Sequence, residues 1–303
     1  GTRALFGGGY IAPGPCFNNV DAITVETLGN TIDFNNLTAS KTGGYTLGNS
    51  TRSVYAGGRL NTTPSGSATN QIQFCTFSTQ NDYSDSGGDL SSSRAFGSGL
   101  CNETRGLFGG GLNQSGTTLN TIEFSTIASL GNSTDFGDMT QARDQLAGVS
   151  DTTRAVFAGG VEQSGSQHNI IDFVTIATTG NAQDFGDMTG VNTGSAGSSD
   201  STRGVITVGY TAPNSFLDRI DFITIQSAGN ATDFGDLILA RYLSANMSNS
   251  TRAVIAGGGT PSAQNTIDFV TIKTTGNAND FGDLIGGSNF VVVGTSDSHG
   301  GLS

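Results

Sequence analysis

The dipeptide Thr-Arg recurs along this chain at nearly constant intervals. It begins at residues 2, 51, 104, 153, 202 and 251, so successive copies are 49, 53, 49, 49 and 49 residues apart. Six copies account for all 303 residues. Self-similarity at a period of about 40 to 50 residues is typical of repeat architectures, in which each unit packs against its neighbours. The spacing therefore constrains the fold more than any local pattern does.

Each copy contains four segments with strand character. The first runs from Thr-Arg into glycines, as in "TRAVFAGG" at 153, and the second alternates apolar and polar residues, as in "IIDFVTI" at 170. A Gly-Asn turn follows, then a segment such as "QDFGDM" at 183, and finally a run of mainly small and apolar residues. Period-two alternation between turn residues is the signature of antiparallel strands. Each copy is thus predicted to form one four-stranded sheet.

Four-stranded units of this length match the blades of a β-propeller. The sequence therefore predicts an all-β fold in which residues 1–303 form a single six-bladed propeller. The chain starts at a Thr-Arg strand and lacks the strand that should precede it. We expect residues 288–297, "SNFVVVGTSD", to supply that innermost strand beside 2–8, 19–26 and 31–37. The C-terminal strand would then join the N-terminal blade and close the ring.

The repeats resemble those of kelch propellers, whose second strand ends in a double glycine. That place is taken by Gly8-Gly9, Gly57-Gly58, Gly110-Gly111, Gly159-Gly160 and Gly257-Gly258, and by Val208-Gly209 in the fifth copy. The kelch tryptophan is absent, and the resemblance implies Phe136, Phe185, Phe234 and Phe281 in its stead. More narrowly, phrases such as "TRAVFAGG" and "TIDFVTI" are similar to repeats in virion proteins of marine and cyanobacterial phages. This similarity implies a tail fibre or capsid appendage.

Composition and motifs exclude several classes of function. A net charge of −12 and a pI near 4.3 disfavour nucleic acid, and no apolar run is long enough to insert in a membrane. Three cysteines and two histidines at irregular spacing predict neither a disulfide framework nor a metal site. The tripeptide DFG recurs in four copies without the other kinase motifs, which marks it as structural. We expect no enzymatic activity, no metal and no cofactor; the aspartates beside DFG are interpreted as turn caps rather than calcium ligands.

The repeated arginines call for a partner, because they hold six of the thirteen Lys and Arg residues. We interpret Arg3, Arg52, Arg105, Arg154, Arg203 and Arg252 as structural ties between blades. Their candidate partners are loop carbonyls and the aspartates of the DFGD segments, either Asp138, Asp187, Asp236 and Asp283 or Asp135, Asp184, Asp233 and Asp280. The alternative is a ring of arginines for an anionic ligand. On the structural interpretation, Arg154→Ala should lower stability clearly, whereas Arg143→Ala, in a blade-connecting stretch, should matter little.

Connections on one face of the ring vary between copies, and variable loops on a rigid scaffold are where recognition usually resides. The candidate ligand-binding residues are Tyr10, Phe17, Arg59, Tyr210, Phe216 and Tyr242, although each by itself is equally typical of an ordinary loop. Blade-to-blade stretches place Lys41, Tyr45, Arg94, Arg143 and Arg241 on the same face. We expect a binding module on a virion or extracellular surface that recognises a host surface glycan or protein. The alternative is a structural or decorating subunit of a virion or extracellular filament.

Overall fold

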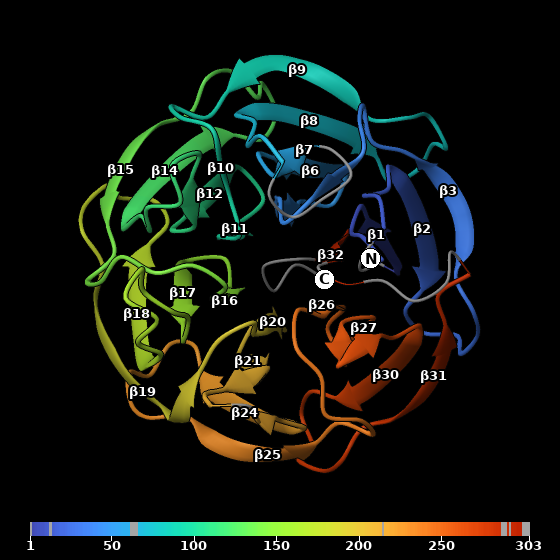
Figure 1. The fold of residues 1–303 in the computed structure, drawn as a ribbon, viewed down its shortest axis with the longest axis vertical. Helices are drawn as coiled ribbons and strands as arrows, with labels where there is room; N and C mark the ends of the chain where they lie inside the picture. The colour runs from blue at the N-terminus through green and yellow to red at the C-terminus, as the bar shows by residue number, and fades with distance from the viewer. Residues whose placement is uncertain are drawn as a thin grey trace.

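A computed structural model describes residues 2–11, 14–60, 66–213, 215–285, 290 and 292–298. Six four-stranded antiparallel sheets surround a central axis (Figure 1), which confirms the all-β, six-bladed propeller predicted from the repeats. The innermost strand of each sheet lies beside the axis, and the fourth lies at the rim. Every element in the described part of the chain is a strand.

From the axis outward, blade 1 consists of β32 (Val293–Ser296), β1 (Arg3–Gly7), β2 (Asn19–Thr24) and β3 (Ile32–Asn36). Blade 2 consists of β5 (Tyr45–Gly48), β6 (Arg52–Ala56), β8 (Gln71–Thr76) and β9 (Ser84–Asp89). Blade 3 consists of β11 (Ser98–Cys101), β12 (Arg105–Gly109), β14 (Thr121–Thr126) and β15 (Thr134–Asp138). Blade 4 consists of β16 (Ala147–Ser150), β17 (Arg154–Ala158), β18 (His168–Thr175) and β19 (Gln183–Asn192). Blade 5 consists of β20 (Ala196–Ser199), β21 (Arg203–Thr207), β24 (Arg219–Thr224) and β25 (Thr232–Asp236). Blade 6 consists of β26 (Ala245–Ser248), β27 (Arg252–Ala256), β30 (Thr266–Thr271) and β31 (Asn279–Asp283).

Four pairs of two-residue strands complete the structure. They are β4 (Lys41–Thr42) with β7 (Arg59–Leu60), β10 (Arg94–Ala95) with β13 (Leu112–Asn113), β22 (Tyr210–Thr211) with β23 (Ser215–Phe216), and β28 (Gly259–Thr260) with β29 (Ser262–Ala263). The first two pairs join a blade-to-blade connection to the loop after the second strand of the next blade.

The two ends of the chain meet in blade 1. Strand β32 pairs antiparallel with β1, with Ala4 opposite Ser296 and Gly7 opposite Val293. The closing strand is therefore found where it was predicted, although it spans four residues rather than 288–297. Residues 288, 289 and 291 of the predicted strand lie outside the described residues.

An Asn or Asp side chain organises the hairpin that leads into each Thr-Arg strand. In blade 4, Asp151 Oδ1 accepts hydrogen bonds of 2.7 Å from the backbone amides of both Thr153 and Arg154. Asn49, Asn102, Asp200 and Asn249 make the same pair of contacts in their blades. In blade 1, where the chain is interrupted, Asp297 accepts from the amide of Arg3 instead, at 3.1 Å. This Asx turn explains why the Thr-Arg pairs of blades 2 to 6 each follow Asn or Asp by two residues.

The arginine of each Thr-Arg pair reaches the next blade. The Arg154 guanidinium lies 4.6 Å from the ring centroid of Phe173 in its own blade, and its Nη1 donates to the Ile225 carbonyl of blade 5, 3.1 Å away. Equivalent contacts are made by Arg3, Arg52, Arg105, Arg203 and Arg252. Each arginine thus combines a cation–π contact with a charge-assisted hydrogen bond across the junction.

The carboxylate partners suggested by the sequence are wrong. Ion pairs within the described ranges involve other residues, and the arginines of Thr-Arg bind backbone carbonyls instead. The first aspartate of each DFGD segment, such as Asp184, is exposed to solvent on the rim strand. The carbonyl that Arg154 binds instead, that of Ile225, directly follows the third strand of blade 5.

The DFGD segments and the Gly-Asn turns form a seam at the rim. Between blades 4 and 5, the amide of Gly229 donates to the Phe185 carbonyl and the amide of Ala231 donates to the Asp187 carbonyl, both at 2.7 Å. The Asn230 side chain accepts from the amide of Asp187 at 3.0 Å. The turn of one blade therefore covers the outer edge of the preceding blade's fourth strand. An open edge would otherwise remain available for pairing with another chain.

Glycine is required on the DFGD side of this seam. Gly186 has φ of +143°, and a Cβ there would lie 2.5 Å from the carbonyl group of Gly229. Gly282 of blade 6 meets Gly29 of blade 1 in the same way, across the closure of the ring. The close approach of two backbones explains why glycine recurs in the DFG segment.

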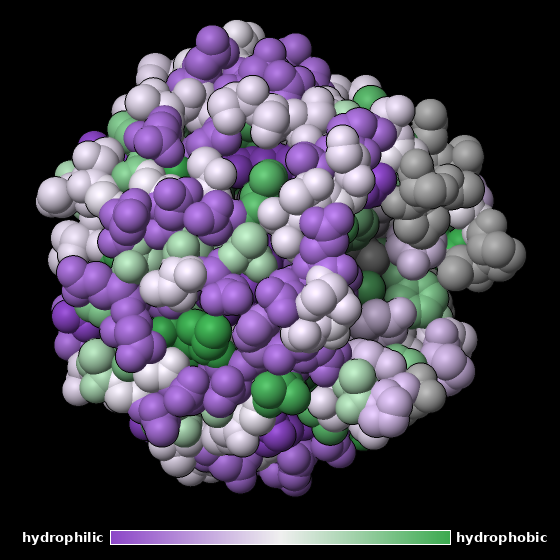
Figure 2. Space-filling model, turned by 60° about the vertical axis from the view of Figure 1, so that its left-hand side comes forward, coloured by the Kyte–Doolittle hydropathy of each residue, from purple (hydrophilic) through white to green (hydrophobic). Residues whose placement is uncertain are grey.

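The hydrophobic core lies between the blades. One cluster combines Val205 and Phe234 of blade 5 with Ile255 and Val270 of blade 6, and another joins Phe6 of blade 1 to blade 6. Both faces of each sheet are therefore covered by neighbours. The outer surface in Figure 2 is mostly hydrophilic, with small hydrophobic areas between polar side chains.

Candidate functional site

The loops between second and third strands and the connections between blades emerge on the same side of the ring. We call this side the loop face. Its connections enter the innermost strand of the following blade, and loop strands such as β22 and β28 begin directly after the second strand. The rigid blades thus hold the variable segments in fixed positions.

Five aromatic rings on the loop face form a continuous group that crosses three blades. Phe216 and Tyr210 of blade 5 lie 5.7 Å apart by ring centroids, and Tyr242, in the connection to blade 6, lies 5.4 Å from Phe216 and 6.1 Å from Tyr210. Phe290 lies 6.1 Å from Tyr242 and stacks on Tyr10 of blade 1 at 5.6 Å. We call these five residues the aromatic row.

Backbone pairing fixes the members of the row. Tyr10 and Phe290 exchange two backbone hydrogen bonds of 3.1 and 2.9 Å, and Tyr242 exchanges two with Gly259 of 3.2 and 3.0 Å. Gly259 also makes room, because a Cβ there would lie only 1.7 Å from the Phe290 ring. The equivalent positions in the other blades are Tyr10, Arg59, Leu112, Val161 and Tyr210. The absence of a side chain in blade 6 lets Phe290 bridge the two ends of the row.

The row is a half-exposed surface on a buried base. Tyr10, Tyr210, Phe216 and Tyr242 are half-buried, whereas Phe290 is buried beneath them. Burial raises the pKa of Tyr242, and the nearby Tyr210 adds to the effect; burial likewise raises the pKa of Tyr10. Their hydroxyls therefore stay protonated at physiological pH and can donate hydrogen bonds.

Four of the six candidate residues from the sequence belong to this row, and two do not. Arg59 lies in blade 2, with its guanidinium 5.7 Å from the Phe96 ring and Nη1 bonded to the Gly66 carbonyl at 3.1 Å. Phe17 is half-buried in the loop of blade 1, where its amide bonds to Gly9 at 2.9 Å. Sequence reasoning missed Phe290, although an aromatic residue in the closing segment was a visible signal.

The blade-connecting stretches contain buried cations rather than exposed ones, which corrects the expectation for Arg143. Arg94, Arg143 and Arg241 are fully or almost fully buried, and each pairs with an acid in the third strand of the next blade. The distances are 3.3 Å from Arg94 to Glu123, 2.5 Å from Arg143 to Asp172 and 3.2 Å from Arg241 to Asp268. These side chains are unavailable to a ligand. The sequence signal for these buried ion pairs was the acid that recurs within the apolar third strand.

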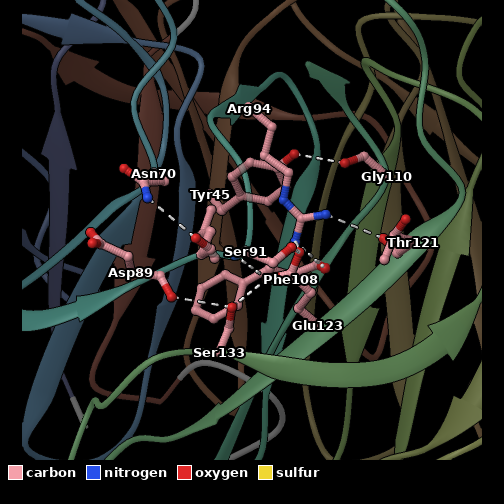
Figure 3. Close-up of polar contacts among 11 residues, drawn as sticks. Tyr45, Asn70, Asp89, Ser91, Arg94, Phe108, Gly110, Thr121, Glu123 and Ser133 are labelled. Atoms are coloured by element: carbon pink, nitrogen blue, oxygen red, sulfur yellow. Dashed lines mark hydrogen bonds and ion pairs between the residues drawn. The ribbon is translucent and has the colours of Figure 1, made fainter. Parts of the chain in front are cut away.

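Figure 3 shows the arrangement around Arg94. Its guanidinium lies over the Tyr45 ring, 5.2 Å from the centroid, and donates to the Phe108 carbonyl at 3.1 Å. Ser91 and Ser133 donate to the carboxylate of Glu123. Burial would raise the pKa of Glu123, but Arg94 and the two serines outweigh it and hold that pKa below its usual value. A charged pair is thus retained inside the protein.

Lys41 is the member of this series without an acid. Its side chain is 1% exposed, and its Nζ donates to Gln71 Oε1 at 2.7 Å. Gln73 stands where blades 3, 4 and 6 have Glu123, Asp172 and Asp268. Burial lowers the pKa of Lys41 from 10.5 to about 8, and the charge of Asp85 opposes this only in part.

The contribution of Lys41 to the stability of the protein is therefore expected to rise between about pH 8 and 10.5. Below pH 8 both the folded and unfolded chains carry the proton, so the cost of burying the charge is present in full. Above it the folded chain releases the proton first. At about 1.4 kcal/mol per pH unit, the gain in unfolding free energy is on the order of 3 kcal/mol.

Urea unfolding at pH 7.5 and 10 checks this expectation. Lys41→Met should remove that part of the pH dependence, and a variant with the same slope as the wild type would contradict it. Gln73→Glu should raise stability at pH 7.5, because it supplies a carboxylate and removes the buried, unbonded Nε2 of Gln73.

A small cavity lies on the axis below the loop face. It has a volume of about 110 Å³ and is lined mainly by small residues of the innermost strands, including Thr46, Ser98, Ser195 and Asn246. Enclosed ligand pockets typically measure roughly 300 to 1,000 Å³. This axial cavity is too small for such a ligand.

The described residues provide neither a cluster of three His, Cys, Asp or Glu side chains suited to a metal ion nor a helix that is long and apolar enough to cross a membrane. The three cysteines are buried and unpaired with one another. His168 lies 3.9 Å from Glu162 at the surface of the loop face.

Comparison with known proteins gives no match to a family model and none to a curated protein. The fold is therefore established by the structure alone.

Proposed function

We propose that this chain is a binding module of a phage virion that recognises a host surface glycan or protein through its loop face. The observation that carries the proposal is the aromatic row. Tyr10, Tyr210, Phe216 and Tyr242 are half-exposed side chains of large contact area, held on loops of a rigid ring. Rigid aromatic residues dominate binding energy at many interfaces because little conformational entropy is lost when they bind.

The placement on a virion or extracellular surface rests on the wording of the repeats. Their similarity to repeats of phage virion proteins supports a tail fibre or capsid appendage. The double glycines after the second strands, such as Gly110 and Gly111 with φ of +65° and +95°, support a kelch-like type of blade. We propose a non-enzymatic role without cofactor or metal, since the row offers contact surface and hydroxyl donors rather than paired acid–base groups.

Binding of the labelled protein to intact cells of candidate hosts tests this proposal. We expect saturable binding that Tyr242→Ala and Tyr210→Ala reduce at least tenfold, with Lys273→Ala, in the exposed turn after β30 on the other face of the ring, as a control. Unchanged binding by both tyrosine variants would remove the row as the site.

A structural or decorating subunit is the second candidate. Ile238 and Ile285 are 58% and 53% exposed at the start of the connections from blades 5 and 6, where blade 4 has Thr189 bonded to Asp221. Exposed aliphatic side chains at repeated positions suit contact with another subunit. Loss of particle incorporation in the double variant Ile238→Ser, Ile285→Ser, with cell binding retained, would favour this candidate.

A further inference from the structure

The segments that build the aromatic row are almost free of charge. Residues 9–18, 209–218, 237–244, 258–265 and 284–292 contain only two charged side chains, Asp218 and Arg241, in a chain that has 38 of them. Arg241 is 1% exposed and pairs with Asp268. These segments thus offer no accessible cation to an anionic ligand, and Arg219, which follows one of them, is paired with Asp221 at 3.1 Å. The net charge of −12 disfavours such a ligand further.

The chemistry of the row combines apolar ring surface with hydroxyl groups. Tyr10, Tyr210 and Tyr242 each carry a phenol, and Gln264 and Ser262 lie in the neighbouring loop of blade 6. Such a surface suits a ligand that has both CH faces and hydroxyl groups and carries no charge. An uncharged pyranose meets this description.

The length of the aromatic row favours an extended ligand over a single sugar ring. Successive centroids are 5.4 to 6.1 Å apart when the buried ring of Phe290 is included, and the row runs from blade 5 across blade 6 to blade 1. Its residues are tied to different blades, so their relative positions are set before binding, which lowers the entropic cost. The axial cavity of about 110 Å³ is too small to take over this role.

On this basis, and resting on the proposed function, we infer that the aromatic row binds an uncharged linear oligosaccharide that lies across blades 5, 6 and 1. Each sugar packs a CH face on one ring or between two rings, and the tyrosine hydroxyls donate to sugar oxygens. Phe290 supports the centre of the row from below, and Gly259 leaves it room to do so.

Tyrosine fluorescence provides a direct test, because the chain has no tryptophan and six tyrosines. Three of the six belong to the row, and the others, Tyr45, Tyr55 and Tyr83, are buried. The probes are cellohexaose, maltohexaose and chitohexaose, their disaccharides, and hexagalacturonate as an acidic control. We expect saturable binding of at least one neutral hexasaccharide, more than tenfold tighter than its disaccharide and than hexagalacturonate.

Variants at the two ends of the row complete the test. Tyr10→Ala and Tyr210→Ala should each weaken hexasaccharide binding about tenfold while their melting temperatures stay near that of the wild type. Lys273→Ala, in the exposed turn after β30 on the other face of the ring, should bind as the wild type does. Absence of binding by all three neutral hexasaccharides, tighter binding of hexagalacturonate, or unchanged binding by both tyrosine variants would overturn the inference.

The cell-binding experiment separates this inference from the proposed function. Binding to cells that needs the row but is not displaced by any neutral hexasaccharide would overturn the sugar ligand and leave recognition of a host protein. Hexasaccharide binding without any binding to host cells would support the ligand class and contradict the role in host recognition.

Discussion

Deletion of residues 288–303 is expected to abolish the cooperative unfolding transition of the whole ring. The deletion removes β32, which pairs with β1 over four residues, and the side chain of Ser296, which donates to the Ser248 carbonyl of blade 6 at 2.6 Å. It also removes buried Phe290 and Val292. The inner edge of β1 would then be open at the axis.

The expected loss exceeds about 5 kcal/mol, which is comparable to the entire stability of a typical domain. Thermal unfolding followed by near- and far-ultraviolet circular dichroism measures it. Deletion of 299–303 alone keeps β32 and serves as the control, with an expected melting temperature close to that of the full chain. A peptide of residues 288–303 added in trans should restore the transition; equal melting temperatures for the full and shortened chains would contradict closure by this strand.

Arg143→Ala is expected to be the most destabilising single substitution among the arginines. Arg143 and Asp172 are both fully buried, and the guanidinium also donates to the carbonyls of Gly159 and Ile170 at 2.7 and 2.9 Å. Removal of the cation leaves a buried carboxylate without its charge partner. Loss of one member of such a pair costs about 3 to 5 kcal/mol.

Arg154→Ala is the informative comparison. Arg154 is half-buried and makes one carbonyl contact and one ring contact, so its loss is expected to cost only about 1 to 2 kcal/mol. Chemical denaturation of both variants measures the difference. The double variant Arg143→Met, Asp172→Leu should regain most of the stability, because it removes both charges. A larger effect at Arg154 than at Arg143 would show that the buried pair contributes little.

The strands and their order were predictable because both depend on short-range signals. Alternation in segments such as Arg219–Thr224, and the constant spacing of Thr-Arg, determine where each sheet begins and how many there are. The closing strand was predictable because the first blade lacks its innermost strand and the C-terminal segment supplies one more strand than the sixth blade needs. Its length was not, because pairing with β1 ends at Val293.

The outcome for the connecting stretches shows where such reasoning fails. Arg143 and Asp172 are far apart in a linear pattern, and a loop arginine is ordinarily solvated. Only the packing of one blade on the next covers it. The aromatic row has the same origin, since Tyr10 and Tyr210 belong to loops 200 positions apart that are brought to nearby blades by ring closure. The aromatic side chain of Phe290 joins them because position 259 is glycine and leaves room for it.

The rim seam between DFGD segments and Gly-Asn turns has a consequence for engineering. The seam uses strand ends and turns, such as Asp187 with Asn230, and takes no residue from the loop face. Loop sequences can therefore be exchanged between blades while the rim seam is kept, but loop-to-loop contacts such as that of the Ala212 amide with Gln167 Oε1, at 2.8 Å, must be exchanged with them. Transfer of the segment 210–217 to the corresponding loops of blades 3 and 4 would multiply the aromatic surface around the ring. The propeller can in this sense serve as a scaffold that displays six loops on one face.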